Sequence, residues 1–173
     1  VRGCADGYGS NCLLIRKDIL MELYIGGFAQ GKLEYVQNKK AEEATSIVMV
    51  IDCAQSDYQK TLQSIDNKIK NENADVNNIA NVNDIVIINH LHMWVKDLLR
   101  EGMEESEVQS TILSWVATHP NTILICDELG NGIVPLEKMD RIWREQTGRL
   151  MIELAKQAER VERILCGLGQ RLK

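Results

Sequence analysis

Long apolar runs are missing from this sequence, since none reaches the roughly 18 residues that a membrane-spanning helix requires. Residues 1–18 also lack the order of a signal peptide, in which a charged segment, an apolar core and a small-residue cleavage site follow one another. We therefore expect a soluble, cytoplasmic protein without a membrane span. Long blocks of like charge are absent too, and the net charge of −5 argues against a general nucleic-acid binder.

The cysteines lack the spacing of a zinc site or a disulfide framework. There are five of them, an odd number, and none forms a Cys-x-x-Cys pair. This usage fits reduced thiols in a cytoplasm. Cys126 and Cys166 lie in apolar runs, which predicts core positions for both.

The length and composition predict one folded domain. With 173 residues, 45% of them apolar, and no long linker, the chain can bury a sizeable core. Met21 precedes the first predicted strand, so we expect a single nucleotide-binding domain over residues 21–173 and an adventitious or disordered extension over residues 1–20. Residues 71–84 are rich in asparagine, which is typical of a solvated loop.

Apolar runs of strand length alternate with helical patterns, and this alternation predicts an α/β fold. The predicted strands are Leu23–Ile25, Ile47–Ile51, Ile85–Ile88, Thr122–Cys126 and Arg163–Cys166. The predicted helices are Lys32–Asn38, Tyr58–Asn71, His92–Glu101, Ser106–Thr118 and Leu136–Arg160. Several strands are apolar at every position, as expected in the centre of a parallel sheet covered on both faces.

The segment Gly26–Lys32 has the Gly-x-x-x-x-Gly-Lys spacing of a phosphate-binding P-loop. It lies between a predicted strand and a predicted helix, where backbone N–H groups form an anion nest and the helix N-terminus adds positive charge. Lys32 would reach the outer phosphates, whereas Leu33 stands where a Ser or Thr hydroxyl commonly ligates magnesium. A glycine-rich turn that binds nothing is the alternative. The predicted nucleotide-binding residues are Gly26, Gly27, Phe28, Ala29, Gln30, Gly31, Lys32 and Leu33.

Acidic and basic side chains near the C-terminal half add candidates to this site. Asp127 and Glu128 follow a predicted strand and could hold magnesium or its water, although a solvated turn is the alternative. Arg141 and Arg144 share one helical face, so they could bind a phosphate or a neighbouring subunit, or face solvent. Pro135 fits the first position of that helix.

One segment carries a more specific resemblance, and it reads Glu128-Leu129-Gly130-Asn131-Gly132-Ile133-Val134-Pro135. It is similar to the Glu-Val-Gly-x-Gly-Ile-Val-Pro signature of the bifunctional adenosylcobinamide kinase / adenosylcobinamide-phosphate guanylyltransferase family of cobalamin biosynthesis. Arg141 and Arg144 fall in register with that family, and Gly167 and Lys173 stand at its expected end. The P-loop and the segment His92–Leu99 also resemble the corresponding parts of the family.

The resemblance implies a three-layer P-loop (RecA-like) domain with a mostly parallel central sheet. It implies a kinase that, with Mg²⁺, transfers the γ-phosphate of ATP or GTP to the aminopropanol hydroxyl of the corrinoid adenosylcobinamide. Lys32 and Glu128 would be catalytic, and Asp127 with Glu128 would hold the metal. A homo-oligomer is implied as well, because family active sites involve neighbouring subunits. The remaining substrate or phosphate candidates are Arg141, Arg144, Asn89 and His90.

Three departures from the family pattern bear on activity. Leu33 replaces the serine of the family loop, and Asn89 stands where the family commonly has a glutamate, which is the better ligand for a hard cation. No histidine lies between Lys32 and Ile88, where family members carry the nucleophile that accepts GMP, so the guanylyltransferase step is doubtful. His90 and a second histidine two residues later lie close by, but packing at a helix entry is the more frequent role of such a pair.

These departures leave two other hypotheses open. A degenerate family member would bind nucleotide or corrinoid without turnover; Leu33, Asn89 and the missing histidine favour it, whereas the intact Gly31-Lys32 favours an enzyme. A generic P-loop kinase for another small alcohol is the third hypothesis, and substrate profiling would separate it from the first.

Overall fold

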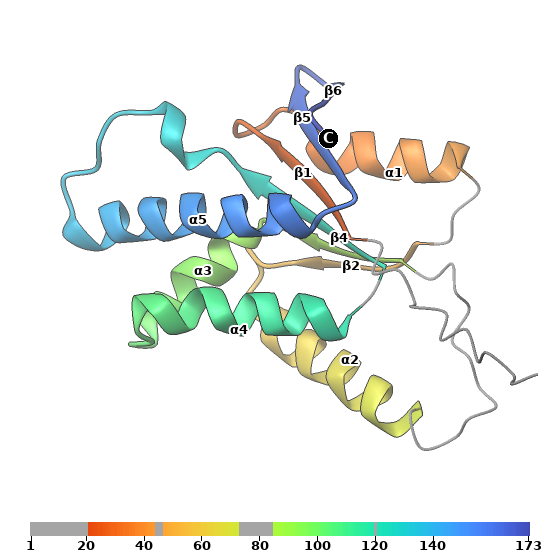
Figure 1. Cartoon of the computed structure of the whole chain (residues 1–173), viewed down its shortest axis with the longest axis horizontal. Coiled ribbons are helices and arrows are strands. Elements are labelled where there is room, and N and C mark those ends of the chain that lie inside the picture. The colour runs from red at the N-terminus through yellow and green to blue at the C-terminus, as the bar shows by residue number, and fades with distance from the viewer. Residues whose placement is uncertain (1–20, 44–46, 73–84, 120) are drawn as a thin grey trace, which may run out of the picture.

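The computed structural model describes residues 21–43, 47–72, 85–119 and 121–173, in which strands alternate with helices (Figure 1). The strands are β1 (Glu22–Gly26), β2 (Ile47–Asp52), β3 (Ile85–Asn89), β4 (Thr122–Asp127), β5 (Arg160–Leu165) and β6 (Leu168–Arg171). The helices are α1 (Lys32–Glu42), α2 (Tyr58–Glu72), α3 (Leu91–Arg100), α4 (Glu105–Thr118), the 3-10 turn η1 (Leu129–Asn131) and α5 (Lys138–Gln157). The predicted N-terminal extension and most of the asparagine-rich segment lie outside the described residues.

The strands form one six-stranded sheet in the order β2-β3-β4-β1-β5-β6. Every neighbouring pair is parallel except β5 and β6, which pair antiparallel. The predicted α/β fold with a mostly parallel central sheet is therefore confirmed. No helix in the described part of the chain combines the length and the apolar character needed to cross a membrane.

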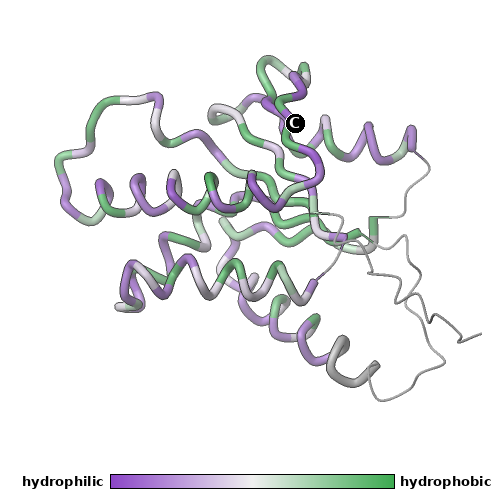
Figure 2. The backbone as a smooth tube through the Cα atoms, viewed as in Figure 1, coloured by the Kyte–Doolittle hydropathy of each residue, from purple (hydrophilic) through white to green (hydrophobic). Residues whose placement is uncertain are grey.

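Each face of the sheet has its own core, because successive side chains of a strand point to opposite faces. On β1, Leu23 belongs to the larger core, together with residues of α2, α3, α4 and α5. Its neighbour Tyr24 belongs to the smaller core, which it shares with Val36 of α1. Helix α1 covers one face and the other helices cover the opposite face, while apolar residues concentrate in the strands between them (Figures 1 and 2). The domain thus has three layers.

The sheet has a topological switch point between β1 and β4. The chain leaves β1 toward α1 on one face and leaves β4 toward α5 on the other, and such a reversal opens a crevice at the carboxyl ends of the two strands. The strand register places Gly26 of β1 beside Asp127 of β4 and Ile164 of β5. The P-loop and the acidic pair therefore meet at this crevice.

Helix α5 begins later than the sequence predicts, at Lys138 instead of Leu136. Glu137, at its N-cap, has extended backbone angles, and the Arg141 guanidinium donates hydrogen bonds to the carbonyls of Pro135 and Leu136. The Arg141 side chain, one turn into the helix, thus binds both carbonyls in a non-helical loop. The prediction of Pro135 at the first helical position is therefore wrong.

The C-terminal strands also differ from the prediction. Strand β5 begins at Arg160 because its polar residues are paired; Glu162, for example, is buried against Lys39 and Tyr35 of α1. Strand β6 was not predicted, since it is exposed along its length and has no apolar alternation. Cys126 lies in the core as predicted, but Cys166 is exposed in the β5–β6 turn, so its predicted core position is wrong.

Candidate nucleotide-binding site

The P-loop backbone is shaped by its contacts with β5 and with the turn that follows it. A Cβ atom at Gly26 would lie 2.4 Å from the carbonyl oxygen of Ile164, and Gly31 has a positive φ of 75° just before α1. Gln30 ties the loop down: its side-chain Oε1 accepts a hydrogen bond from the Cys166 N–H at 2.6 Å, and its carbonyl accepts one from Gly167 at 3.0 Å. The loop is therefore preshaped by the sheet.

The Gly26 contact predicts a difference between the first two glycines of the loop. We expect Gly26→Ala to destabilise the protein by roughly 1–3 kcal/mol, because the new methyl group meets a backbone carbonyl that cannot move alone. Gly27→Ala is the matched control, since its methyl group would lie 3.5 Å from the flexible Gln30 side chain. Urea unfolding of both variants measures the difference, and equal midpoints would contradict the proposed packing.

Lys32 lies inside the crevice and already has two partners. Its ammonium group donates a hydrogen bond to the Gly27 carbonyl at 2.7 Å and forms an ion pair with Asp127 Oδ1 at 2.6 Å. Only 7% of either side chain in this pair is exposed. Leu33, one residue later, packs against the smaller core, so this position contributes an apolar side chain. The loop thus presents a preplaced cation without a neighbouring hydroxyl.

The two predicted acidic residues have different surroundings. Asp127 is buried next to Lys32, whereas Glu128 accepts hydrogen bonds from the Arg163 guanidinium at 2.9 Å and from the Asn131 amide at 2.7 Å. The backbone N–H of Glu128 also bonds to the Gly26 carbonyl at 2.8 Å, which joins the acidic pair to the P-loop. Each carboxylate is thus paired with a cation, Asp127 with Lys32 and Glu128 with Arg163.

A polar cluster lies at the carboxyl ends of β2 and β3, where Asp52 and Asn89 are register partners. His90 Nδ1 lies 2.7 Å from Asp52 Oδ1, and Asn89 Nδ2 lies 3.4 Å from Asp52 Oδ2. Burial raises the pKa of Asp52, but the hydrogen bonds from His90 and from the Ala54 backbone outweigh it and hold that pKa below its usual value. Asp52 is therefore ionised at neutral pH.

His92 is buried between this cluster and Asp127. Its Nδ1 accepts a hydrogen bond from the Asp127 backbone N–H at 3.3 Å, and its Nε2 lies 3.8 Å from Asp127 Oδ2. Burial lowers its pKa to about 4, with the Asp127 carboxylate opposing this shift and the nearby positive charge of Lys32 acting in the same direction. His92 is therefore neutral at pH 7, with its proton on Nε2.

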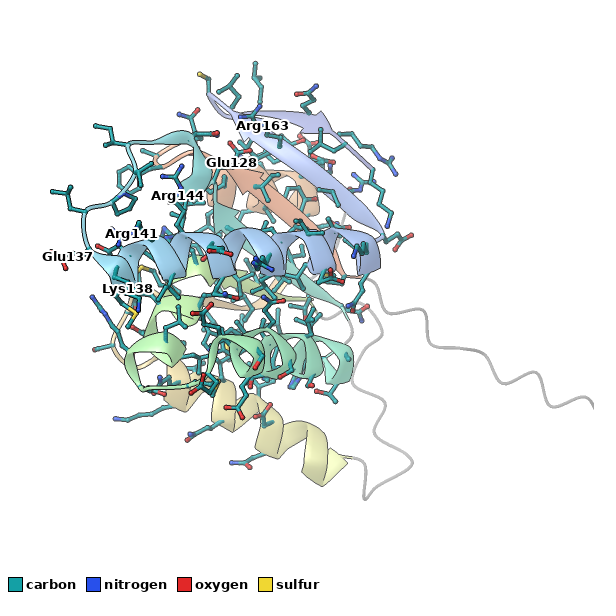
Figure 3. All side chains as sticks on the ribbon, turned by 60° about the vertical axis from the view of Figure 1, so that its left-hand side comes forward. Glu128, Glu137, Lys138, Arg141, Arg144 and Arg163 are labelled. Atoms are coloured by element: carbon teal, nitrogen blue, oxygen red, sulfur yellow. The ribbon has the colours of Figure 1, made fainter. Side chains whose placement is uncertain are left out.

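The two predicted arginine candidates hold the loop between η1 and α5 (Figure 3). Arg144 donates hydrogen bonds to the carbonyls of Gly130, Gly132 and Ile133, and Arg141 bonds to the loop carbonyls nearer the helix. In the described residues both guanidinium groups are thus engaged with backbone. This loop carries three exposed apolar side chains, Ile133, Val134 and Leu136.

The Arg144 contacts predict a local effect of its removal. We expect Arg144→Ala to increase amide hydrogen exchange in residues 128–137 while lowering global stability by only about 1 kcal/mol, because the lost bonds are partly exposed. Arg149→Ala is the control on the same helix, since Arg149 forms only an exposed ion pair with Glu145. Exchange measured by mass spectrometry that is alike in both variants would contradict this role.

Two hollows flank the P-loop. A cavity of about 440 Å³ is lined by Asp127, Glu128 and Arg163, together with apolar residues of β1 and α5. A groove of about 450 Å³ lies on the other side, between α1 and the β5–β6 turn, where Gly31 and Gly167 line it. Both volumes are in the range of small-molecule sites. The crevice therefore offers room on both sides of the loop.

Sequence reasoning placed Lys32 and Asp127 in one site, and the structure brings them together. It missed Asp52, Arg163 and the contact of Gln30 with the β5–β6 turn. Asp52 could have been found, because it follows a predicted strand and the carboxyl ends of parallel strands share one edge of the sheet. The role of Arg163 and the Gln30 contact depend on how β5 and its turn pack against the rest of the domain. The predicted strand there began at Arg163, whereas β5 begins at Arg160.

Comparison with known proteins identifies the family of this chain. A family model described as cobinamide kinase / cobinamide phosphate guanyltransferase matches residues 29–172. The bifunctional adenosylcobalamin biosynthesis protein CobU of Escherichia coli (strain K12) is 28% identical over 109 residues, which cover 54% of this chain. The match spans 60% of that relative, less than two thirds of its length. Since the family model covers most of the sequence, the chain belongs to the cobinamide kinase / cobinamide phosphate guanyltransferase family.

Proposed function

We propose that this protein is a kinase that transfers the γ-phosphate of ATP or GTP to the aminopropanol hydroxyl of adenosylcobinamide. The observation that carries the proposal is the buried Lys32–Asp127 pair, 2.6 Å apart at the mouth of a preshaped P-loop. A lysine held beside an anion-binding loop is suited to neutralise the outer phosphates of a nucleotide. Family membership supports the corrinoid as the acceptor.

The protein contributes position and charge to such a transfer. In the proposed mechanism the N–H groups of Gly27–Lys32 cradle the β- and γ-phosphates, and Lys32 exchanges its bonds with the Gly27 carbonyl and with Asp127 for the phosphate oxygens. Asp127 then loses its cationic partner and becomes available as a ligand.

Within the described residues, no group of three His, Cys, Asp or Glu side chains forms a preassembled metal site. Magnesium commonly binds through one or two carboxylates plus substrate phosphates, so this finding suits a metal that arrives with the nucleotide. Asp127 would hold it, with Glu128 in support. The ion would neutralise charge that develops between the β- and γ-phosphates.

A second function is favoured by Leu33 and Asn89. The first contributes no hydroxyl to a metal and the second no carboxylate, so the protein could bind nucleotide or corrinoid without turnover. The guanylyltransferase step is doubtful for a separate reason, because the chain has only three histidines, His90, His92 and His119, and none lies between β1 and β3. A homo-oligomer stays a proposal, with the exposed side chains of Ile133 and Leu136 as the surface that a neighbouring subunit would cover.

The deciding experiment is calorimetric titration with ATP and GTP, each with and without magnesium, followed by a phosphorylation assay on adenosylcobinamide. Magnesium-dependent binding with transfer is the expected result. Binding without transfer to this or any other small alcohol would support the binding module instead. Absence of nucleotide binding would exclude the kinase and a nucleotide-binding module.

A further inference from the structure

The Asp52–His90 pair has the geometry of an oriented base. His90 Nδ1 lies 2.7 Å from Asp52 Oδ1 and 3.1 Å from Asn89 Nδ2. Because an ionised carboxylate can only accept, the shorter contact assigns the N–H to Nδ1 and leaves the lone pair on Nε2. Asn89 steadies the other carboxylate oxygen, at 3.4 Å. An amide cannot take a proton at neutral pH, and thus Asn89 itself is no base.

The backbone at His90 is unusual in the same place. His90 has φ 55° and ψ 44°, the left-handed conformation that is uncommon in residues other than Gly but is enriched in Asn, Asp and His. Such outliers cluster at functional sites, where the surrounding structure holds them. This conformation turns the imidazole toward Asp52 at the carboxyl edge of the sheet, and the side chain remains 31% exposed.

The pair also lies on the same carboxyl edge of the sheet as Lys32 of the P-loop. A row of side chains runs along this edge. The centroids of the His90 and His92 rings are 5.6 Å apart, and His92 Nε2 is 3.8 Å from Asp127 Oδ2. Asp127 Oδ1 is in turn 2.6 Å from Lys32 Nζ. His92 cannot serve as the base, because its Nδ1 lone pair is occupied by the Asp127 N–H and its Nε2 carries the proton. His90 is therefore the accessible imidazole of this row, with Asp52, Asn89 and His92 facing it.

We propose that Nε2 of His90, oriented by Asp52, is the base that takes the proton from the acceptor hydroxyl during phosphoryl transfer. This role rests on the proposed kinase function. The hydroxyl oxygen attacks the γ-phosphorus and forms a new P–O bond, the bond from that phosphorus to the β–γ bridging oxygen breaks, and nucleoside diphosphate leaves. The hydroxyl proton moves to Nε2, the imidazolium is stabilised by the Asp52 carboxylate, and the proton then passes to solvent from the exposed side of the ring.

The test compares His90→Asn with the wild type, because asparagine tolerates the left-handed conformation but is no base at neutral pH. Nucleotide affinity, measured by calorimetry, should stay within twofold or so, whereas kcat for phosphorylation of adenosylcobinamide should fall by about 10²- to 10⁴-fold. The acidic limb of the kcat–pH profile should disappear. Asp52→Asn, which removes only the orienting charge, should give a smaller loss of kcat.

A rescue experiment separates chemistry from structure. His90→Gly also accepts the positive φ and leaves space at the site, so added imidazole should restore part of its activity. The same imidazole should not rescue Lys32→Ala, which lacks the phosphate ligand. A structural role for His90 would show no rescue, and that result would overturn the proposal.

Three other results would also overturn it. One is wild-type kcat in His90→Asn, and another is loss of kcat matched by an equal loss of nucleotide affinity. A third is ³²P from the γ-phosphate held on the wild-type protein but not on His90→Asn, which would make His90 a nucleophile. The kinase function, and this role with it, is overturned if the wild-type protein binds nucleotide but phosphorylates no acceptor. This role alone is overturned if the wild type is active and His90→Asn is equally active.

Discussion

Replacing Lys32 by methionine should destabilise the nucleotide-free protein by about 3–5 kcal/mol and abolish nucleotide binding. Methionine fills much of the space of the lysine stem but leaves the Asp127 carboxylate without its cation in a position that is only 7% exposed. An unpaired buried carboxylate costs far more than the pair itself contributes. The same change removes the charge that we assign to the β- and γ-phosphates.

A double variant tests whether the stability loss comes from Asp127. Adding Asp127→Asn to Lys32→Met replaces both charges by neutral groups, so urea unfolding should show most of the lost stability restored. Nucleotide binding, measured by calorimetry, should stay absent in both variants. If the double variant is no more stable than Lys32→Met alone, the buried charge is not the cause of the loss.

Stability should fall by roughly 3 kcal/mol between pH 6.5 and pH 4 because of His92 alone. Its pKa in the folded protein is lowered to about 4, mainly by burial, whereas the unfolded chain keeps the ordinary value near 6.5. Between these two values the unfolded state binds a proton that the folded state does not. Acidification through this window therefore favours unfolding. Above about pH 6.5 His92 is neutral in both states, and the loss of stability that it causes disappears.

His92→Asn checks this expectation, because its side-chain carbonyl can still accept the Asp127 N–H while the residue does not titrate. Urea unfolding of both proteins at pH 4, 5, 6 and 7 gives the slope of stability against pH. Around pH 5 the slope of the variant should be smaller by about one proton. Carboxylates with lowered pKa, such as Asp52 and Glu162, lose their contribution at still lower pH and act equally in both proteins. Parallel slopes would show that His92 is already protonated in the folded state or does not titrate differently on folding.

The fold followed closely from local sequence signals. Ile85–Ile88 and Thr122–Cys126 are apolar at nearly every position because both faces of a parallel strand are covered, and the predicted strands there are confirmed to within one residue. The same signal fails at β5, where Glu162 is buried by pairing with the distant Lys39 and Arg160 is half-buried against Glu162. It fails at β6, an exposed edge strand that buries no apolar side chain.

Residue types at fixed short spacings were enough to predict the family, the α/β alternation and the P-loop motif. Which side chains meet could be read only from the folded arrangement of the strands. It brings Asp127 of β4 to Lys32, Asp52 of β2 to His90, and Arg163 of β5 to Glu128, pairs that lie 95, 38 and 35 residues apart in the chain. Strand order and register set these meetings, since parallel strands deliver their carboxyl ends to one edge of the sheet whatever their distance in sequence.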